Sequence, residues 1–390
     1  MSRNSVKWLP AIVVPVVIVA GVLAVPLQAG ATVDLPDKTP EQVLLMVSDS
    51  TVTAYSGTVE KTAELGLPDI DLSGMSGSMA DSMAESAPEG MTESGTAATG
   101  ALASVMELFS GSHTARIYVD ASDADGPAKA RVQIQDRMDE RNVVSNGTDV
   151  WAYDSKTNTA SRLAIPADAR ATAEAKLAEM VASAPADLST PSQVAERFLS
   201  EIDPSTTVSV GTDGTVAGRT AYELVLTPKA TQTLVESVSI SVDSETGMPL
   251  QVTVRANGQD EPAFQVGFTA VDFRTPSADL FDFSPPSDAT VEEIVPPVMP
   301  EQPADQAKPE IPAENLPVVM GTGWDAIVAV PAASVPAELS ANPLMSELAT
   351  PVEGGQVFST SLVNVFLADD GRIFAGSVPV ELLQAAADAQ

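Results

Sequence analysis

Few side chains in this sequence could act as a base, a nucleophile or a metal ligand. The chain contains one histidine, His113, and no cysteine. A single histidine excludes a site built from several histidines, and any Ser-His-Asp arrangement would depend on His113 alone. The glycine-serine elbow of esterases, the paired-histidine zinc motif and the glycine-rich phosphate and dinucleotide loops are absent. We therefore predict no catalytic residue, no metal site and no cofactor, and we interpret His113 as a structural residue at the start of a strand.

Three methionines recur at every fourth position in a Gly/Ser-rich segment: Met75, Met79 and Met83. Three interpretations are open. The segment can be a flexible, low-complexity loop. Its thioethers can form an adaptable lid over apolar ligands. Methionine also ligates the soft ion Cu(I), although no cysteine or histidine lies nearby to complete such a site.

The charge of the chain argues against one class of partner. Its formal net charge is −33. Binding of phosphate backbones needs clustered Lys and Arg, so we expect no nucleic-acid partner. Acidity of this kind keeps an exported protein soluble. The lack of cysteine excludes disulfides, thiol chemistry and a lipidated N-terminal cysteine.

Residues 1–31 predict passage through a membrane. Arg3 and Lys7 precede an apolar stretch without charges, residues 8–27, and Ala29-Gly30-Ala31 supplies the small residues that signal peptidase accepts. The stretch is also about as long as the ~20 residues of a membrane span, so a retained anchor is the alternative to a cleaved signal. Either way, we expect an extracytoplasmic protein, secreted or anchored to the outer face of the cytoplasmic membrane.

Strict alternation of apolar and polar residues predicts strands from residue 55 to about residue 283. Alternation buries one face of each strand, which favours an antiparallel sheet of about ten strands with one solvated face. Turn sequences such as Asn146-Gly147 and Asp213-Gly214 separate the strands. The predicted apolar face includes Ile117, Val119, Val132, Ile134, Leu224, Leu226, Val238, Ile240, Val252 and Val254.

An apolar face must be covered, and three helical patterns could cover it. Residues 39–53 begin with Thr39 before Pro40, a typical helix start. Residues 167–184 and 190–202 also have helical periodicity. The sequence therefore predicts an α+β fold, in which a large antiparallel half-open β-barrel is covered by short helices. An insertion at 66–112 interrupts this predicted domain, which spans residues 32–288.

The C-terminal quarter reads as two further parts. Residues 289–317 form a predicted acidic linker, and nine prolines lie between Ser284 and Pro317. Residues 318–390 form a predicted small α/β module, with strands in 319–330 and 357–374 and a closing helix at 380–387.

Six segments together carry a resemblance to a known family. They are residues 55–60, 146–154, 157–162, 222–229, 240–250 and 280–286. In this order, and across about residues 39–288, they resemble the LolA-like lipoprotein-carrier superfamily, which includes LppX-type lipid carriers and RseB/MucB-type regulators. The insertion, linker and C-terminal module look like an actinobacterial branch of this superfamily.

The resemblance implies a half-open barrel with an apolar cavity for acyl chains. It predicts a non-enzymatic exported protein that holds a lipid, or the acyl chains of a lipoprotein, for carriage across the envelope. The alternative is an envelope-stress sensor or accessory subunit that acts on a membrane protein. The resemblance also implies that the ten apolar residues named above line the cavity.

Overall fold

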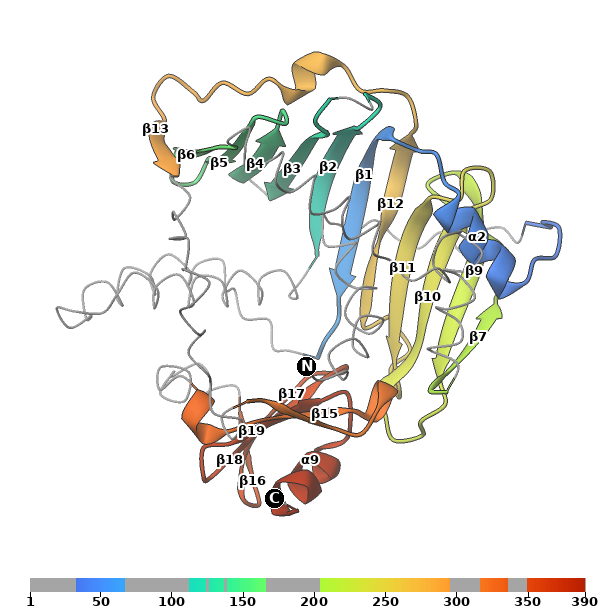
Figure 1. The fold of residues 1–390 in the computed structure, drawn as a ribbon, viewed down its shortest axis with the longest axis vertical. Coiled ribbons are helices and arrows are strands. Elements are labelled where there is room, and N and C mark those ends of the chain that lie inside the picture. The colour runs from blue at the N-terminus through green and yellow to red at the C-terminus, as the bar shows by residue number, and fades with distance from the viewer. Residues whose placement is uncertain are drawn as a thin grey trace, which may run out of the picture.

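The computed structural model describes residues 33–66, 112–123, 126–136, 139–165, 204–294, 316–335 and 349–389. These residues form two β-sheets and few helices (Figure 1). The N-terminal apolar stretch, the methionine series and the predicted helices 167–184 and 190–202 lie outside the described residues.

The larger sheet has 13 strands, more than the ten predicted, and it does not close into a barrel. Its order is β13-β6-β5-β4-β3-β2-β1-β12-β11-β10-β9-β7, and β8 pairs with β9. All strand pairs are antiparallel except β13 with β6. The strands are β1 Ala54–Ala63, β2 His113–Asp120, β3 Lys129–Asp136, β4 Asp139–Ser145, β5 Asp149–Asp154, β6 Thr159–Ala164, β7 Thr206–Val210, β8 Gly214–Val216, β9 Arg219–Pro228, β10 Val235–Asp243, β11 Pro249–Ala256, β12 Phe264–Asp272 and β13 Thr290–Ile294.

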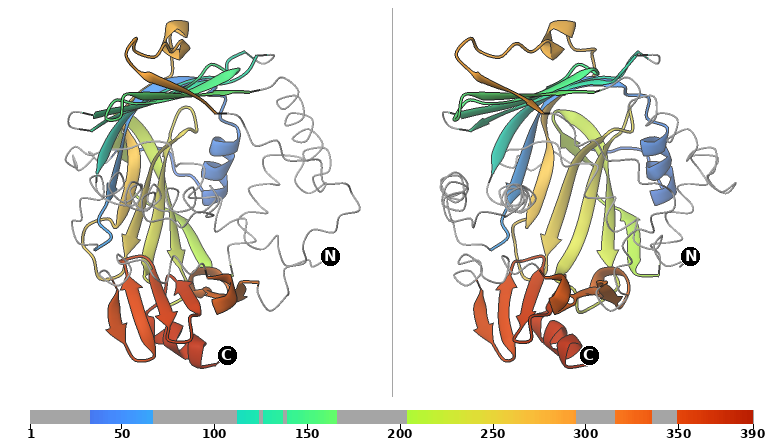
Figure 2. Two further views of the ribbon diagram at one scale, coloured as in Figure 1. Left: turned by 90° about the vertical axis from the view of Figure 1, so that its left-hand side faces the viewer. Right: turned by 60° about the vertical axis from the view of Figure 1, so that its left-hand side comes forward.

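The large sheet is bent, so that it has an inner and an outer face. Strands β2–β6 turn away from the direction of β9–β12, and helix α2, Pro40–Ser48, lies inside the bend (Figure 2). We call the face that carries α2 the inner face and the opposite one the outer face. The predicted antiparallel sheet is confirmed, in an open form.

Helix α2 is shorter than the predicted segment 39–53. Thr39 and Gln42 form a reciprocal capping box at its start. The helix ends at Ser48, and Asp49 is its C-terminal cap. Val43 faces the sheet and is fully buried, so the cover predicted at this position exists.

Contacts at both ends fix α2 to the sheet. Before its start, the Tyr222 hydroxyl donates a hydrogen bond of 3.1 Å to the Pro36 carbonyl, and the Leu35 amide donates one of 3.3 Å to Asp213. In its last turn, the Met46 backbone lies directly against Gly247 of the β10–β11 turn. The helix is therefore a fixed part of the fold.

A strap from Phe273 to Asp288 crosses the outer face of β3–β5. It contains the 3-10 helix η2, Ala278–Phe281, and Phe281 is 1% exposed. The Phe283 ring lies 5.6 Å from that of Trp151, and the Arg131 guanidinium donates a hydrogen bond of 3.1 Å to the Leu280 carbonyl. The outer face of this half is thus partly covered.

Beyond the strap, the structure differs from the predicted start of the linker at residue 289. Thr290–Ile294 form β13 and pair in parallel with β6. The Thr290 amide donates to the carbonyl of Asn158, whose φ of 49° turns the chain between β5 and β6. A parallel edge strand has no hairpin turn beside it, and no local pattern indicated this pairing.

The second sheet is small and entirely antiparallel, so this part is an antiparallel sheet with one helix rather than an alternating α/β unit. Its order is β14-β15-β19-β18-β17-β16. The predicted closing helix is found as α9, Val380–Asp388, and its Leu383 packs with Phe366 and Phe374. The remaining elements are β14 Val318–Met320, η4 Gly323–Asp325, β15 Ile327–Val330, η5 Ala332–Ser334, β16 Thr350–Val352, β17 Gly355–Ser359, β18 Asn364–Ala368 and β19 Ile373–Gly376.

The second sheet contacts one end of the large sheet, the lower end in Figure 1. The Leu234 amide donates a hydrogen bond of 2.7 Å to the Ser377 carbonyl, and the Ser361 amide donates one of 2.9 Å to Leu65. The Trp324 indole donates one of 2.8 Å to the Thr206 hydroxyl. The segment after β1, the first residue of β7 and the segment before β10 therefore contact the C-terminal part of the chain.

Candidate functional site

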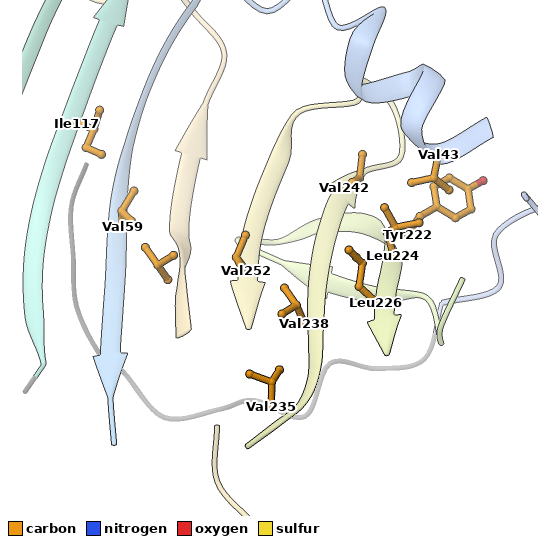
Figure 3. Close-up of a cluster of buried hydrophobic side chains, with 11 residues drawn as sticks. Val43, Val59, Ile117, Tyr222, Leu224, Leu226, Val235, Val238, Val242 and Val252 are labelled. Carbon is orange, nitrogen blue, oxygen red and sulfur yellow. The ribbon is translucent and has the colours of Figure 1, made fainter. Parts of the chain in front are cut away.

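The ten apolar residues singled out in the sequence lie on β2, β3, β9, β10 and β11. The strand register aligns them on the inner face. Ile240 is opposite both Leu224 and Val252, and Val238 is opposite both Leu226 and Val254. Ile117 is opposite Val132. Figure 3 shows side chains of this set on one side of the ribbons, together with Val43 of α2.

Most of the set belongs to one hydrophobic cluster. Leu224, Leu226, Val238 and Val252 are at most 8% exposed, as is Ile117. Val119, Ile240 and Val254 pack against this cluster while remaining partly exposed. Six further buried members of the cluster are not among the ten, namely Val43, Val59, Tyr222, Val235, Val242 and Val266.

The burial of the inner face decreases from β2 toward the β13 edge. Along one cross-strand row, Ile117 is 6% exposed, Val132 is intermediate and Val143 is 45% exposed. Val132 and Ile134 are not members of the hydrophobic cluster. Farther out on the same face, Ile294 is 50% exposed. The apolar surface thus continues beyond the core that α2 covers.

The bend between the two halves lies at β1 and β12. Their register shifts between Thr58 and Val59, and an irregularity of this kind increases local twist. Beside it, the Phe268 ring lies against Gly57, where a Cβ would come within 2.7 Å of the ring. Phe268 also meets Tyr55 edge to face at 6.0 Å. Glycine at position 57 therefore lets an aromatic ring lie across β1 on the inner face.

Two polar residues also occupy the inner face. Lys61 lies two residues after Val59 in β1, is 2% exposed and is directly opposite His113 of β2. Sequence analysis missed Lys61, although alternation with Val59 in β1 could have found it. His113 is the first residue of β2, as the sequence predicted.

Glu60, the neighbour of Lys61, points to the outer face. It is 7% exposed, and within the described part of the chain its Oε1 has no hydrogen-bond partner. Burial raises the pKa of Glu60 to about 7. This carboxyl group is therefore largely protonated in mildly acidic solution.

The β10–β11 turn that supports α2 is held by a buried carboxylate. Asp243 is fully buried and forms an ion pair with Arg219, and the Thr246 amide donates to it at 2.7 Å. Burial opposes ionisation of Asp243, but hydrogen bonds from Arg219 and Thr246 outweigh it, so the pKa is lowered. This ion pair fixes the turn in which Gly247 meets α2.

Within the described ranges, no three His, Cys, Asp or Glu side chains gather as a possible metal site. Those ranges also include no helix long and apolar enough to cross a membrane. The methionines considered for Cu(I) lie outside them.

Part of this chain matches a described protein family, and the chain is similar to several solved structures. Residues 113–294 match the family described as "Predicted periplasmic protein (DUF2092)". None of the curated proteins matches the chain. A solved complex of MucA and MucB from Pseudomonas aeruginosa is 13% identical, with 89% of this chain and 96% of that one covered and a TM-score of 0.39.

Two further solved structures are also similar to this chain. A LolA superfamily protein from Nitrosomonas europaea is 9% identical, with 63% of this chain and 99% of that one covered and a TM-score of 0.21. A putative outer membrane lipoprotein-sorting protein domain from Vibrio parahaemolyticus is 13% identical, with 62% and 97% covered and a TM-score of 0.22.

At identities of 9–13% and TM-scores of 0.21–0.39, these likenesses transfer no family, site residue or activity to this chain. Membership of the LolA-like superfamily stays a prediction from the sequence motifs. The actinobacterial branch stays a prediction.

Proposed function

We propose that this protein is an exported, non-enzymatic binding protein that holds acyl chains of a lipid or lipoprotein against the inner face of its large sheet. The observation that carries the proposal is the row from Ile117 through Val132 to Val143, whose exposure rises from 6% to 45%. The row stays apolar through Val143 and Ala152, beyond the buried cluster, and becomes polar only at Ser161 of β6.

The energetics favour an apolar occupant. Each CH₂ group moved from water to an apolar surface gains about 0.8 kcal/mol. An acyl chain lying along the half-exposed row would also shield Val143, which is 45% exposed. The ten predicted residues, Val132 and Ile134 foremost, are the proposed contacts.

Two observations support action outside the cytoplasm. Residues 1–31 have the composition of an export signal or anchor. The family that matches residues 113–294 is described as periplasmic. Carriage across the envelope fits such a location, and the scarcity of catalytic side chains fits a binding role.

A second candidate is a sensor that acts on a membrane protein. It is favoured by the position of the second sheet, whose Trp324 packs against the same cluster as Leu224 and Val238. A ligand on the inner face could thereby change a partner surface on the second sheet. The MucB structure solved with MucA gives a precedent in another protein.

The binding proposal is tested by native mass spectrometry of protein purified from its own envelope. We expect added mass matching a lipid or acylated peptide. Val143→Glu should reduce the fraction of protein that carries this added mass, because the substitution places a charge on the exposed part of the row that begins at Ile117. Val291→Glu is the matched control, since Val291 is 48% exposed on the outer face, in the row of Ala160. Consistent absence of bound lipid, or equal loss in both variants, would refute the proposal.

Crosslinking in cells separates carrier from sensor. A sensor should trap one dominant membrane-protein partner, and Val143→Glu should leave that partner bound. A carrier should instead yield crosslinks to its acylated cargo, which Val143→Glu should reduce.

A further inference from the structure

Two rows of side chains cross the inner face of β2–β6 next to each other. The first row contains Ile117, Val132, Val143, Ala152 and Ser161 and reaches Glu292 of β13. The second row lies two residues away on every strand and contains Val119, Ala130, Ser145, Val150, Leu163 and Ile294. From β2 to β5, Ser145 is the only polar residue in either row. An apolar strip two side chains wide therefore crosses these four strands.

The strip is closed at one end and open at the other. Ile117 at its start is 6% exposed and belongs to the buried cluster. Val132 and Leu163 are partly exposed, Val143 is 45% exposed and Ile294 is 50% exposed. The open end lies at the β13 edge, on the far side of the large sheet from α2 (Figure 1). A ligand that enters from this edge meets exposed apolar side chains directly.

This gradient of burial favours one orientation of an amphiphile on the strip. Hydrocarbon gains free energy when it leaves water, whereas a polar headgroup loses free energy when it is buried without hydrogen-bond partners. The methyl end should therefore point toward Ile117, and the headgroup should lie at the β13 edge. The distance from β2 to β6 is four strand spacings, or ~19 Å, which an extended hexadecyl chain can span.

The open end of the strip carries a negative charge. Glu292 is exposed, is next to Ser161 of β6 and is the only charged residue in the two rows. Its neighbour Glu293 points to the outer face, where it forms an ion pair of 3.0 Å with Arg162. A carboxylate accepts hydrogen bonds and donates none, and it binds an ammonium group more strongly than a neutral donor. The net charge of −33 adds to the repulsion of anionic headgroups.

We propose that the strip binds one acyl or alkyl chain across β2–β6 with its methyl end toward Ile117, and that Glu292 selects ammonium headgroups over anionic ones. This inference rests on the proposed function and adds the orientation of the chain and the chemistry of its headgroup. The apolar rows contact the hydrocarbon whatever the headgroup is. Glu292 therefore determines selectivity, and the chain itself can bind without it.

Photocrosslinking of the full-length protein tests the orientation. Two hexadecylamine probes carry a diazirine, one near the methyl end and the other beside the amine, and mass spectrometry identifies the labelled peptides. We expect the methyl-end probe to label β2 and β3 and the amine-end probe to label β6 and β13. Reversed labelling, or the same labelling by both probes, would overturn the orientation. The comparison uses the wild-type protein, so it does not depend on the folding of a variant.

Calorimetric titration tests the headgroup preference with hexadecylamine and hexadecyl phosphate, both below their micelle concentrations. Glu292→Gln should lower the ratio of the amine's affinity to the phosphate's affinity by ~3-fold, the size expected for an exposed charge pair. Glu293→Gln is the matched control, because it removes the same charge from the outer face of the same strand. An unchanged ratio in Glu292→Gln, or an equal fall in Glu293→Gln, would show that Glu292 selects no headgroup.

The outcomes separate this inference from the proposed function. If the probes bind but the labelling or the affinity ratio contradicts the expectation, the orientation or the headgroup assignment is wrong while acyl-chain binding stands. If neither probe binds, both proposals fail.

Discussion

Gly247 lies so close to Met46 that a Cβ at position 247 would overlap the Met46 carbonyl oxygen. The contact joins the turn between β10 and β11 to the last part of α2. Gly247 also has a φ of 72°, a conformation that glycine adopts without strain. One residue type thus satisfies both the turn and the close approach of the helix.

Gly247→Ala should destabilise the protein by ~2 kcal/mol or more. Left-handed backbone strain costs about 1–2 kcal/mol for a residue with a Cβ, and displacement of α2 from Val43's site adds to it. Gly258→Ala is the control, since Gly258 has a φ of 81° and open space around it. Urea denaturation should show a clearly larger loss at position 247, and equal losses would mean that the contact with Met46 is unimportant.

Glu60→Gln should stabilise the protein at pH 8 and have little effect at pH 4. The folded pKa of about 7 lies above the ordinary value of 4.5 for a glutamate, so the folded state holds its proton more tightly than the unfolded state does. The contribution of Glu60 to the free energy of unfolding is therefore fully present below pH 4.5, and it is lost as the pH rises through about 7. The gain from the substitution should approach, but not exceed, ~3 kcal/mol.

Thermal denaturation of both forms across this pH range measures the effect. Glu236→Gln, at an exposed position, serves as the control for a lost charge. A difference between wild type and Glu60→Gln that does not vary with pH would contradict the raised pKa.

Asp243→Asn should destabilise the protein by ~3 kcal/mol at pH 7. Removal of the carboxylate leaves Arg219 without its buried partner and weakens the turn around Thr246. The folded pKa lies below 3.8, so this contribution is present above that value and is lost as the pH falls through the folded pKa.

The cost of Asp243→Asn should accordingly diminish in strong acid, as measured by denaturant titrations at several pH values. Glu245 is the exposed partner of the same arginine, and its side chain is 76% exposed. Glu245→Gln should therefore lower the stability by less than ~1 kcal/mol. Equal costs for the two variants would show that burial of Asp243 does not matter.

Phe281→Ala should cost ~3–5 kcal/mol in stability, because the side chain of this strap residue is only 1% exposed. Loss of this anchor should also increase amide exchange in β13, which follows the strap. Hydrogen exchange with mass spectrometry measures both β13 and, as an internal reference, β11. Asp282→Ala changes an exposed neighbour and should leave exchange unaltered. Unchanged protection of β13 in Phe281→Ala would show that the strap does not hold it.

The sequence predicted the local part of this fold well. Alternation in segments such as 115–120 and 250–255 identified strands and the face to which Ile117 and Val252 point, because the period of a strand is fixed by its backbone. The capped start of α2 followed from Thr39 and Pro40. Its early end at Ser48 did not, since no residue of the helix pattern marks that end.

Non-local features escaped prediction. The pairing of β13 with β6 involves Asn158 and follows the strap that contains Phe281, and Asn158 and the strap lie far apart in the sequence. The close approach of Gly247 to Met46 is equally invisible in a local pattern. For the candidate site, alternation gave the apolar face but overlooked Lys61, because only apolar positions were followed along β1.

The pairing of β6 with β13 also bears on the order of folding. Arg162 of β6 and Glu293 of β13, which form an ion pair of 3.0 Å, are 131 residues apart in the chain. A chain that emerges from its N-terminus can complete the hairpins β2 to β6 early, but the free edge of β6 must wait for Ile294 to arrive. During that interval the edge presents unpaired amides and carbonyls, which can add a strand from another molecule. This edge is therefore a place where aggregation of newly made chains competes directly with folding.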